Sequence, residues 1–156
     1  MSSNSLRILC DLSWEQFKNK HPEIPESYLP HTKFSDRTAS GLTSCIISWI
    51  RLCGYQSERI NVTGRQIDQR QTYTDVLGHQ RQIGSLKWIP TTGTRGSADI
   101  SATIQGRSVK IEVKVGRDRQ RPDQKEYQKS IEEAGGLYFI ARDFQQFYEW
   151  YIETFE

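Results

Sequence analysis

Polar and apolar residues alternate between Gly96 and Lys114, a pattern that predicts two strands sharing one buried face. The dipeptide Gln105-Gly106 lies in the middle of this stretch and predicts a two-residue hairpin turn, although Asn-Gly is the stronger turn signal. Folded there, the hairpin has an apolar face made of Ile100, Ala102, Ile104, Val109, Ile111, Val113 and Val115. Its other face carries Asp99, Ser101, Thr103, Ser108, Lys110, Glu112 and Lys114. The hairpin thus supplies a core surface on one side and a charged surface on the other.

Asp99 and Glu112 stand opposite each other on the charged face of this predicted hairpin. Cβ atoms of opposite residues lie roughly 5 Å apart, and like charges so placed destabilise a sheet. A divalent cation between the two carboxylates would turn that repulsion into ligation. Alternation alone favours a second interpretation, an ordinary solvated face on which Lys110 and Lys114 neutralise the acids.

Apolar residues at helical spacing predict three helices around the hairpin. The first covers residues 38–53 and ends at Gly54. The second begins at Pro122, which suits the first position of a helix. The third begins at a capping box formed by Asp143 and Gln146. The expected buried stripes are Tyr127, Ile131 and Ala134 on the second helix and Phe144, Phe147, Tyr151 and Phe155 on the third.

Short strands are predicted over Gln56–Val62, Leu86–Ile89 and Leu137–Ala141. The polar stretch Gly64–Ile83, which lies between the first two, is compatible with a hairpin or with a loop. Residues 91–96 are expected to form a tight loop that leads into the strand containing Asp99.

The N-terminal part has a different character from the rest of the chain. Residues 1–12 show no clear signal and are expected to form a loose start. A capping box at Ser13 predicts a short helix that ends at Lys20, and the prolines of residues 21–36 predict an extended linker. The expected organisation is an N-terminal extension over residues 1–36 and one core domain over residues 37–156.

Composition limits the possible functions only broadly. A chain of 156 residues fits one domain with a real core, and it has no 18-residue apolar run. We therefore expect a soluble, cytoplasmic protein without a membrane partner. Three cysteines without a Cys-x-x-Cys pair and three isolated histidines do not indicate a disulfide framework or a zinc site. The net charge is only +2, but the basic residues concentrate between Arg51 and Lys129, which favours a phosphate-backbone partner over an ordinary solvated surface.

The order of residues around the hairpin resembles the PD-(D/E)xK nuclease superfamily. Asp99 enters one strand, and Glu112-Val-Lys114 follows on its neighbour. A glycine before Asp99, a helix carrying Gln124 and a strand preceded by two glycines make the stretch similar to the VRR-NUC branch. The resemblance covers about residues 40–141.

The resemblance implies a restriction-endonuclease-like α/β core, in which helices flank a mixed central β-sheet. Asp99 and Glu112 would hold Mg²⁺ or Mn²⁺, with the Val113 carbonyl as a further ligand. Lys114 would orient the attacking water or stabilise the transition state, and Gln124 would position the water or the phosphate.

The chain departs from the family pattern at two positions. Many members carry a Glu on the first core helix, and residues 38–53 contain none. Asp36 and Glu58 are distant candidates for a third carboxylate, although structural roles are the simpler expectation for both. Arg121 stands where the family often has an N-capping serine.

The function implied by the resemblance is metal-dependent hydrolysis of DNA phosphodiesters. Relatives of this kind suggest a homodimer acting on branched or flapped DNA, in the manner of a Holliday junction resolvase. Contacts to the DNA backbone are expected from Arg65, Arg81, Arg95, Arg117, Arg119 and Arg121. The missing helix Glu supports an alternative, a catalytically silent nuclease fold that binds DNA or a protein. An RNA-directed nuclease is a third possibility.

Overall fold

The computed structural model describes residues 4–61, 64–89 and 93–156, which belong to two compact units. We call the larger unit, residues 1–60 and 96–156, the body, and the smaller unit, residues 61–95, the ribbon. The body contains α1 (Asn4–Lys20), a 3₁₀ helix (Glu26–Tyr28), α2 (Ala39–Leu52), β1 (Gln56–Arg59), β6 (Ile100–Ile104), β7 (Arg107–Val113), α3 (Pro122–Glu133), β8 (Leu137–Ala141) and α4 (Phe144–Phe155). The ribbon contains β2 (Arg65–Asp68), β3 (Gln71–Thr74), β4 (Gln80–Ile83) and β5 (Leu86–Ile89).

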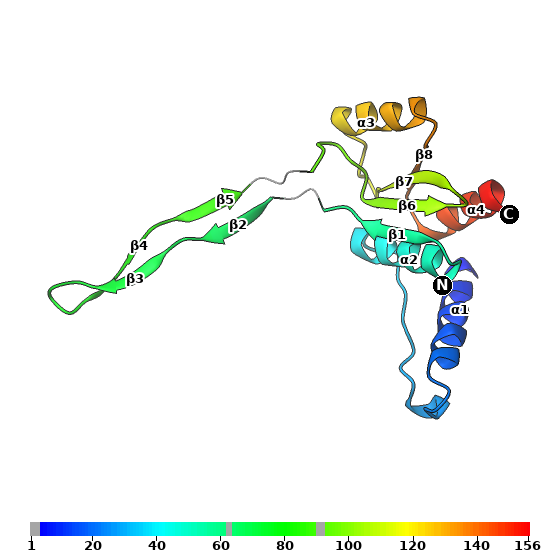
Figure 1. The fold of residues 1–156 in the computed structure, drawn as a ribbon, viewed down its shortest axis with the longest axis horizontal. Helices are drawn as coiled ribbons and strands as arrows, with labels where there is room; N and C mark the ends of the chain where they lie inside the picture. The colour runs from blue at the N-terminus through cyan, green and yellow to red at the C-terminus, as the bar shows by residue number, and fades with distance from the viewer. Residues whose placement is uncertain (1–3, 62–63, 90–92) are drawn as a thin grey trace. The chain divides into compact units, whose positions relative to one another are not determined.

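A mixed four-stranded sheet in the order β1-β6-β7-β8 forms the centre of the body. Both β1 and β7 pair with β6 in antiparallel fashion, whereas β7 and β8 are parallel. A parallel pair needs a crossover connection, which α3 supplies. Figure 1 shows α3 on one side of the sheet and α2 and α4 on the other. The expected α/β fold with a mixed central sheet flanked by helices is confirmed.

The predicted hairpin register is confirmed, since Ile100 pairs with Ile111 and Ile104 with Arg107. Gln105 and Gly106 form the turn with φ angles of 48° and 76°. Positive φ is common for Gly but uncommon for Gln. The Gln105 side chain donates a hydrogen bond of 2.9 Å to the carbonyl of Phe155 at the end of α4. This contact ties the turn to α4 and favours the unusual backbone conformation.

The apolar face of the hairpin packs against α2 and α4, and both predicted core helices are confirmed. Trp49 of α2 makes edge-to-face contacts with the rings of Phe144 and Tyr151 of α4. Burying an apolar side chain of this size contributes about 1.5–3 kcal/mol. The buried apolar residues of the hairpin, α2 and α4 are Ile100, Ala102, Ile104, Val109, Ile111, Val113, Leu42, Cys45, Ile46, Trp49, Ile50, Phe144, Phe147, Tyr151 and Phe155. All three cysteines are free.

The helix α3 covers the other face of the sheet less completely than expected. Tyr127 and Ile131 of the predicted buried stripe are only half-buried, and Ala134 is exposed. The stripe prediction is therefore wrong for Ala134. The reason is that α3 contacts chiefly the edge strand β8, where the Tyr127 ring lies edge-on to the ring of Tyr138.

The prediction of a loose start over residues 1–12 is wrong for residues 4–12, because α1 already begins at Asn4. Leu6 and Leu9 are buried, and α1 packs against α2 and α4. Ser13, expected to cap the helix, lies in its middle instead. The helix ends at Lys20, as predicted.

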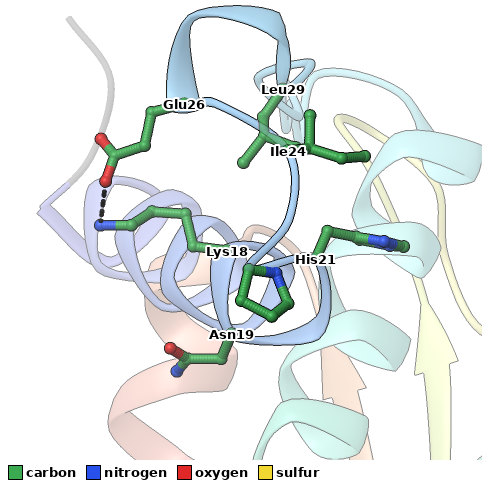
Figure 2. A pocket seen from close by; sticks show the side chains of 7 residues that line it. Lys18, Asn19, His21, Ile24, Glu26 and Leu29 are labelled. Atoms are coloured by element: carbon green, nitrogen blue, oxygen red, sulfur yellow. Dashed lines mark ion pairs between the residues drawn. The ribbon is translucent and has the colours of Figure 1, made fainter.

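The linker over residues 21–36 is extended only in part, because it contains a turn at residues 22–24, closed by a hydrogen bond from Ile24 N–H to the His21 carbonyl, and the 3₁₀ helix. A hollow of about 240 Å³ lies where this linker leaves α1, and Figure 2 shows side chains that line it. Lys18 forms ion pairs there with Glu26 (3.0 Å) and Glu15 (3.3 Å), so its charge is already neutralised. His31 stacks on Trp14. These contacts fix the linker to the helix and give it a structural role.

The ribbon is an antiparallel hairpin, which decides between the two alternatives left open for Gly64–Ile83. β2 pairs with β5, so the predicted strand Leu86–Ile89 belongs to the ribbon and not to the sheet of the body. β3 pairs with β4 in the same continuous register. None of the described ribbon residues is buried. Parts of the predicted strand Gln56–Val62 and of the predicted loop at 91–96 lie outside the described residues.

No described helix has the length and apolar composition needed to cross a membrane.

Candidate active site

Four of the predicted site residues converge on the polar face of the sheet. Asp99 immediately precedes β6, Glu112 and Lys114 lie at the end of β7, and Gln124 lies in the first turn of α3. Glu112 and Lys114 are only 1 % and 5 % exposed, and Asp99 and Gln124 are half-buried. Charged side chains are almost never so buried unless they are paired. The cluster is therefore built into the fold and is not a solvated charged face.

Asp99 is oriented by the strand opposite it. Its Oδ2 accepts a hydrogen bond of 2.8 Å from the backbone N–H of Val113. In a strand, the N–H and C=O of one residue point toward the same neighbouring strand. The Val113 carbonyl therefore points to the side on which Asp99 lies, as its expected role as a third oxygen ligand requires.

The carboxylate of Glu112 has one saturated and one unpartnered oxygen. Its Oε1 accepts a hydrogen bond of 2.5 Å from Nε2 of Gln124 and pairs with Nζ of Lys114 at 3.0 Å. Its Oε2 is buried and has no hydrogen-bond partner among the described residues. A buried acceptor without a partner costs about 1–3 kcal/mol, and more when it is charged. The unpartnered oxygen is the least satisfied feature of the site.

Burial raises the pKa of Glu112, and the nearby negative charge of Asp99 raises it further. Lys114 and Gln124 act in the opposite direction without cancelling the rise. The two carboxylates thus repel each other through a poorly hydrated environment, as the sequence register predicted.

Lys114 is held as a cation by two carboxylates. Its Nζ lies 3.0 Å from Glu112 and 3.2 Å from Asp118. Burial alone would lower the pKa of Lys114, but the two acidic partners outweigh it and the pKa is raised. Lys114 therefore stays protonated near neutral pH and can supply a positive charge, but it cannot act as a base.

Gln124 is positioned by the start of α3. Its Oε1 accepts a hydrogen bond of 3.0 Å from the backbone N–H of Arg121, so that the side-chain amide presents Nε2 to Glu112. This is the reverse half of a capping box, in which the side chain at the third helical position accepts the backbone N–H of the N-cap residue. The glutamine serves the helix end and the site at the same time.

Gly96 explains how the helix start comes so close to the strand. It has a φ of 77°, and a Cβ atom there would collide with the backbone of Asp123 and Gln124. Only glycine permits both this conformation and this approach. The glycine that precedes Asp99 in the sequence thus allows α3 to deliver Gln124 to the site.

Sequence reasoning missed two residues at the site. Asp118 follows Lys114 by four positions and pairs with it, but it was not among the predicted site residues. Tyr138 lies on the polar face of β8, and its buried hydroxyl has no hydrogen-bond partner among the described residues. Burial raises the pKa of Tyr138, and the charge of Glu112 raises it further, so the phenol stays protonated. Side chains of β8 alternate between the two faces of the sheet, and this alternation could have placed Tyr138 on the polar face, where it pairs with Lys110 in the sheet register.

The predicted DNA-contacting arginines are distributed over both units. Arg117, Arg119 and Arg121 are exposed on the loop that follows β7, and Arg95 is exposed before Gly96. Arg65 and Arg81 belong to the ribbon, where Nε of Arg81 pairs with Asp75 at 2.6 Å.

Neither candidate for a third carboxylate joins the pair. Oδ2 of Asp36 accepts a hydrogen bond from the backbone N–H of Phe144, a structural role at the start of α4. Glu58 is exposed on β1, where it pairs with Ser101 in the sheet register. Within the described ranges, no three His, Cys, Asp or Glu residues are grouped so that they could hold a metal ion. Among the described residues, Asp99 and Glu112 are therefore the two acids left for the predicted cation site.

Searches of protein-family models, of curated proteins and of solved structures found no match for this chain. The family interpretation therefore rests on the resemblance of the motif residues and on the geometry of the site.

Proposed function

We propose that the chain is a metal-dependent DNA endonuclease with a restriction-endonuclease-like core of the PD-(D/E)xK type. The observation that carries the proposal is the buried Glu112, which keeps one carboxylate oxygen unpartnered beside Asp99. A structural acid would be expected to have both oxygens satisfied. A ligand that satisfies the second oxygen also removes the repulsion between the two acids.

The residues fit a hard divalent cation, Mg²⁺ or Mn²⁺. Asp99, Glu112 and the Val113 carbonyl offer only oxygen donors, which these ions prefer. A cation bound there would lower the pKa of a water molecule and neutralise charge on the scissile phosphate.

Lys114 and Gln124 complete the proposed chemistry from the protein side. The protonated Lys114 supplies a fixed positive charge for the additional negative charge of the phosphoryl transition state. Asp118 holds the ammonium group from the side of the following loop. Gln124 fixes Glu112 through its amide, so that the free oxygen has a defined direction.

The substrate and the assembly are proposed from the resemblance. Branched or flapped DNA and a homodimer fit it, and the exposed arginines of both units are suited to phosphate contacts without base readout. RNA in place of DNA would use the same chemistry.

A second candidate function is binding without cleavage. Two observations favour it: the described residues provide only two grouped carboxylates, and Lys114 and Gln124 already occupy one oxygen of Glu112. A module that holds nucleic acid or a protein partner would need no third ligand.

Incubation of the protein with linear, nicked, flapped and four-way-junction DNA, in Mg²⁺, Mn²⁺ or EDTA, separates the two functions. We expect cleavage that requires the metal and is lost in Glu112→Gln. Binding of these DNAs without cleavage in either metal would favour the silent module. Cleavage in EDTA, or full activity of Glu112→Gln, would contradict the proposed site.

A further inference from the structure

A positively charged region lies next to the proposed site, in a surface hollow of about 430 Å³. Its lining residues are Gly116, Arg117, Asp118 and Arg119 from the loop after β7, and Arg142 from the end of β8. Because β7 and β8 are parallel neighbours, their carboxyl ends leave the sheet at the same edge. This topology brings Arg142 to the loop arginines, although it lies far from them in the sequence.

The three arginines of the hollow have uncompensated charges. Their side chains are exposed, and none of the three guanidinium groups forms an ion pair with a described residue. Asp118 does not neutralise them, because its Oδ2 pairs with Lys114 and its Oδ1 accepts the backbone N–H of Arg119. Like charges gathered in a concave site repel one another, and an anion in the hollow would remove that repulsion.

The lining residues of the hollow are suited to a phosphate group. Guanidinium groups present planar pairs of donors that match the oxygens of a phosphate group. Aromatic side chains, on which a base would stack, are absent from this lining. The hollow is therefore suited to the backbone of a nucleic-acid strand and not to its bases.

The hollow adjoins the proposed site through one side chain. Asp118 lines the hollow and also holds Lys114, which pairs with Glu112. A strand whose scissile phosphate lies at Lys114 would thus have a neighbouring phosphate close to Arg117, Arg119 and Arg142.

We infer that Arg117, Arg119 and Arg142 form a binding site for a non-scissile phosphate of the substrate strand, an inference that rests on the proposed function. Arg142 is the new member of the set, since its position after β8 gave no sequence signal. Its function is to fix the register of the strand relative to Lys114.

The test compares Arg142→Gln with Arg7→Gln, a matched loss of one positive charge from the exposed side of α1. The first readout is a titration of each protein with inorganic phosphate, followed by NMR of the arginine Nε–Hε groups. We expect saturable shifts of the hollow arginines in the native protein and in Arg7→Gln, and their loss in Arg142→Gln. The double variant Arg117→Gln/Arg119→Gln should lose them as well.

The second readout is binding of a short single-stranded DNA in EDTA over a range of salt concentrations. Arg142→Gln should bind about tenfold more weakly at low salt, and its salt slope should fall by about 0.7, the value for one phosphate contact on a single strand. Arg7→Gln should match the native protein in both respects.

These measurements separate the inference from the proposed function, because neither depends on cleavage. If the native protein binds phosphate and DNA through Arg142 but cleaves nothing with metal, the phosphate site stands and the nuclease proposal fails. Equal behaviour of Arg142→Gln and Arg7→Gln in both readouts would overturn the phosphate site, even in an active nuclease.

Discussion

The body and the ribbon differ in their balance of charged residues and in how many side chains they bury. The body has sixteen Lys and Arg against seventeen Asp and Glu and buries a continuous apolar core. The ribbon has five against two and buries none of its described residues. The surplus positive charge of the chain thus lies in the unit that contributes least to packing.

Because of this difference, we expect the two units to have different roles, one in stability and the other in binding. A two-stranded antiparallel pair is marginal on its own, because it has no second layer against which to bury side chains. Its strands are held by their backbone register and by local ion pairs such as Arg70–Asp68 and Arg81–Asp75. We expect the body to set the stability and the chemistry, and the ribbon to contribute affinity.

The largest expected effect on cleavage comes from neutralising the two acids of the proposed site, Asp99 and Glu112. Asp99→Asn and Glu112→Gln should each reduce cleavage by about 10³-fold or more, since each would remove a ligand of the proposed cation. Both variants should stay folded, and without metal they should melt at or above the native temperature because a like-charge repulsion is gone. Cleavage assays with parallel thermal melts provide the check. A variant that unfolds would indicate that the acids are structural.

Lys114→Ala should reduce turnover by about 10²-fold and change DNA affinity less than twofold. A charge at the reacting phosphate acts on the transition state, whereas the ammonium of Lys114 is already paired with Glu112 and Asp118 and therefore contributes little to ground-state binding. The melting temperature should also fall, because buried Glu112 loses its partner. Single-turnover kinetics and binding in EDTA distinguish these effects. Normal turnover with weaker binding would assign Lys114 to backbone contacts.

Replacing residues 61–95 with a short Gly/Ser linker tests whether stability comes from the body and DNA affinity from the ribbon. The body should keep its melting temperature within a few degrees, because the removed unit buries no side chain among its described residues. DNA affinity should fall about tenfold or more at low salt, and the salt slope should become shallower. Unchanged affinity would remove the ribbon from the binding surface, and a large loss of stability would show that it supports the body.

Sequence patterns predicted the elements in which apolar residues recur with one regular spacing, either every second residue in a strand or at helical spacing. The hairpin around Gln105 and the helices α2 and α4 have one apolar face, so alternation or helical spacing identifies them. The described part of the ribbon is exposed or half-buried throughout, and only its short run Leu86–Ile89 gave a strand signal. The start of α1 was missed because Leu6 and Leu9 are its only fully buried apolar residues.

Within the site, the sequence indicated residue types and register but not the contacts between elements. Asp99 and Glu112 follow from the hairpin register alone. The double role of Gln124 depends on the approach of α3 past Gly96, which local sequence does not specify. Arg142 joins the loop arginines only through the parallel pairing of β7 and β8.

The two units should also respond to pH with opposite signs. The pKa of Glu112 in the body is raised, mainly by burial, so the folded state retains its proton more strongly than the unfolded chain does. Its contribution to stability is present below the unfolded pKa of about 4.3 and is lost as pH rises through the folded pKa. In metal-free buffer, Glu112→Gln should lack this loss. Denaturant unfolding of the two proteins from pH 4 to pH 8 provides the measurement, and parallel pH profiles would contradict it.

The smallest expected effect is the reverse dependence in the ribbon. The side chain of Arg70 lowers the pKa of Asp68 to about 2, so the ionised carboxylate favours the folded ribbon. Its contribution is present above the ordinary pKa of about 3.9 and is lost as pH falls toward 2. Because the pair is exposed, the effect is local. As pH falls, the loss should appear as faster hydrogen exchange of the Arg70 backbone amide with solvent. This amide donates a hydrogen bond of 2.9 Å to Oδ1 of Asp68. Asp68→Asn should lose the pH dependence below pH 4, and an Arg70 amide that behaves identically in both proteins would show that the pair does not hold the ribbon.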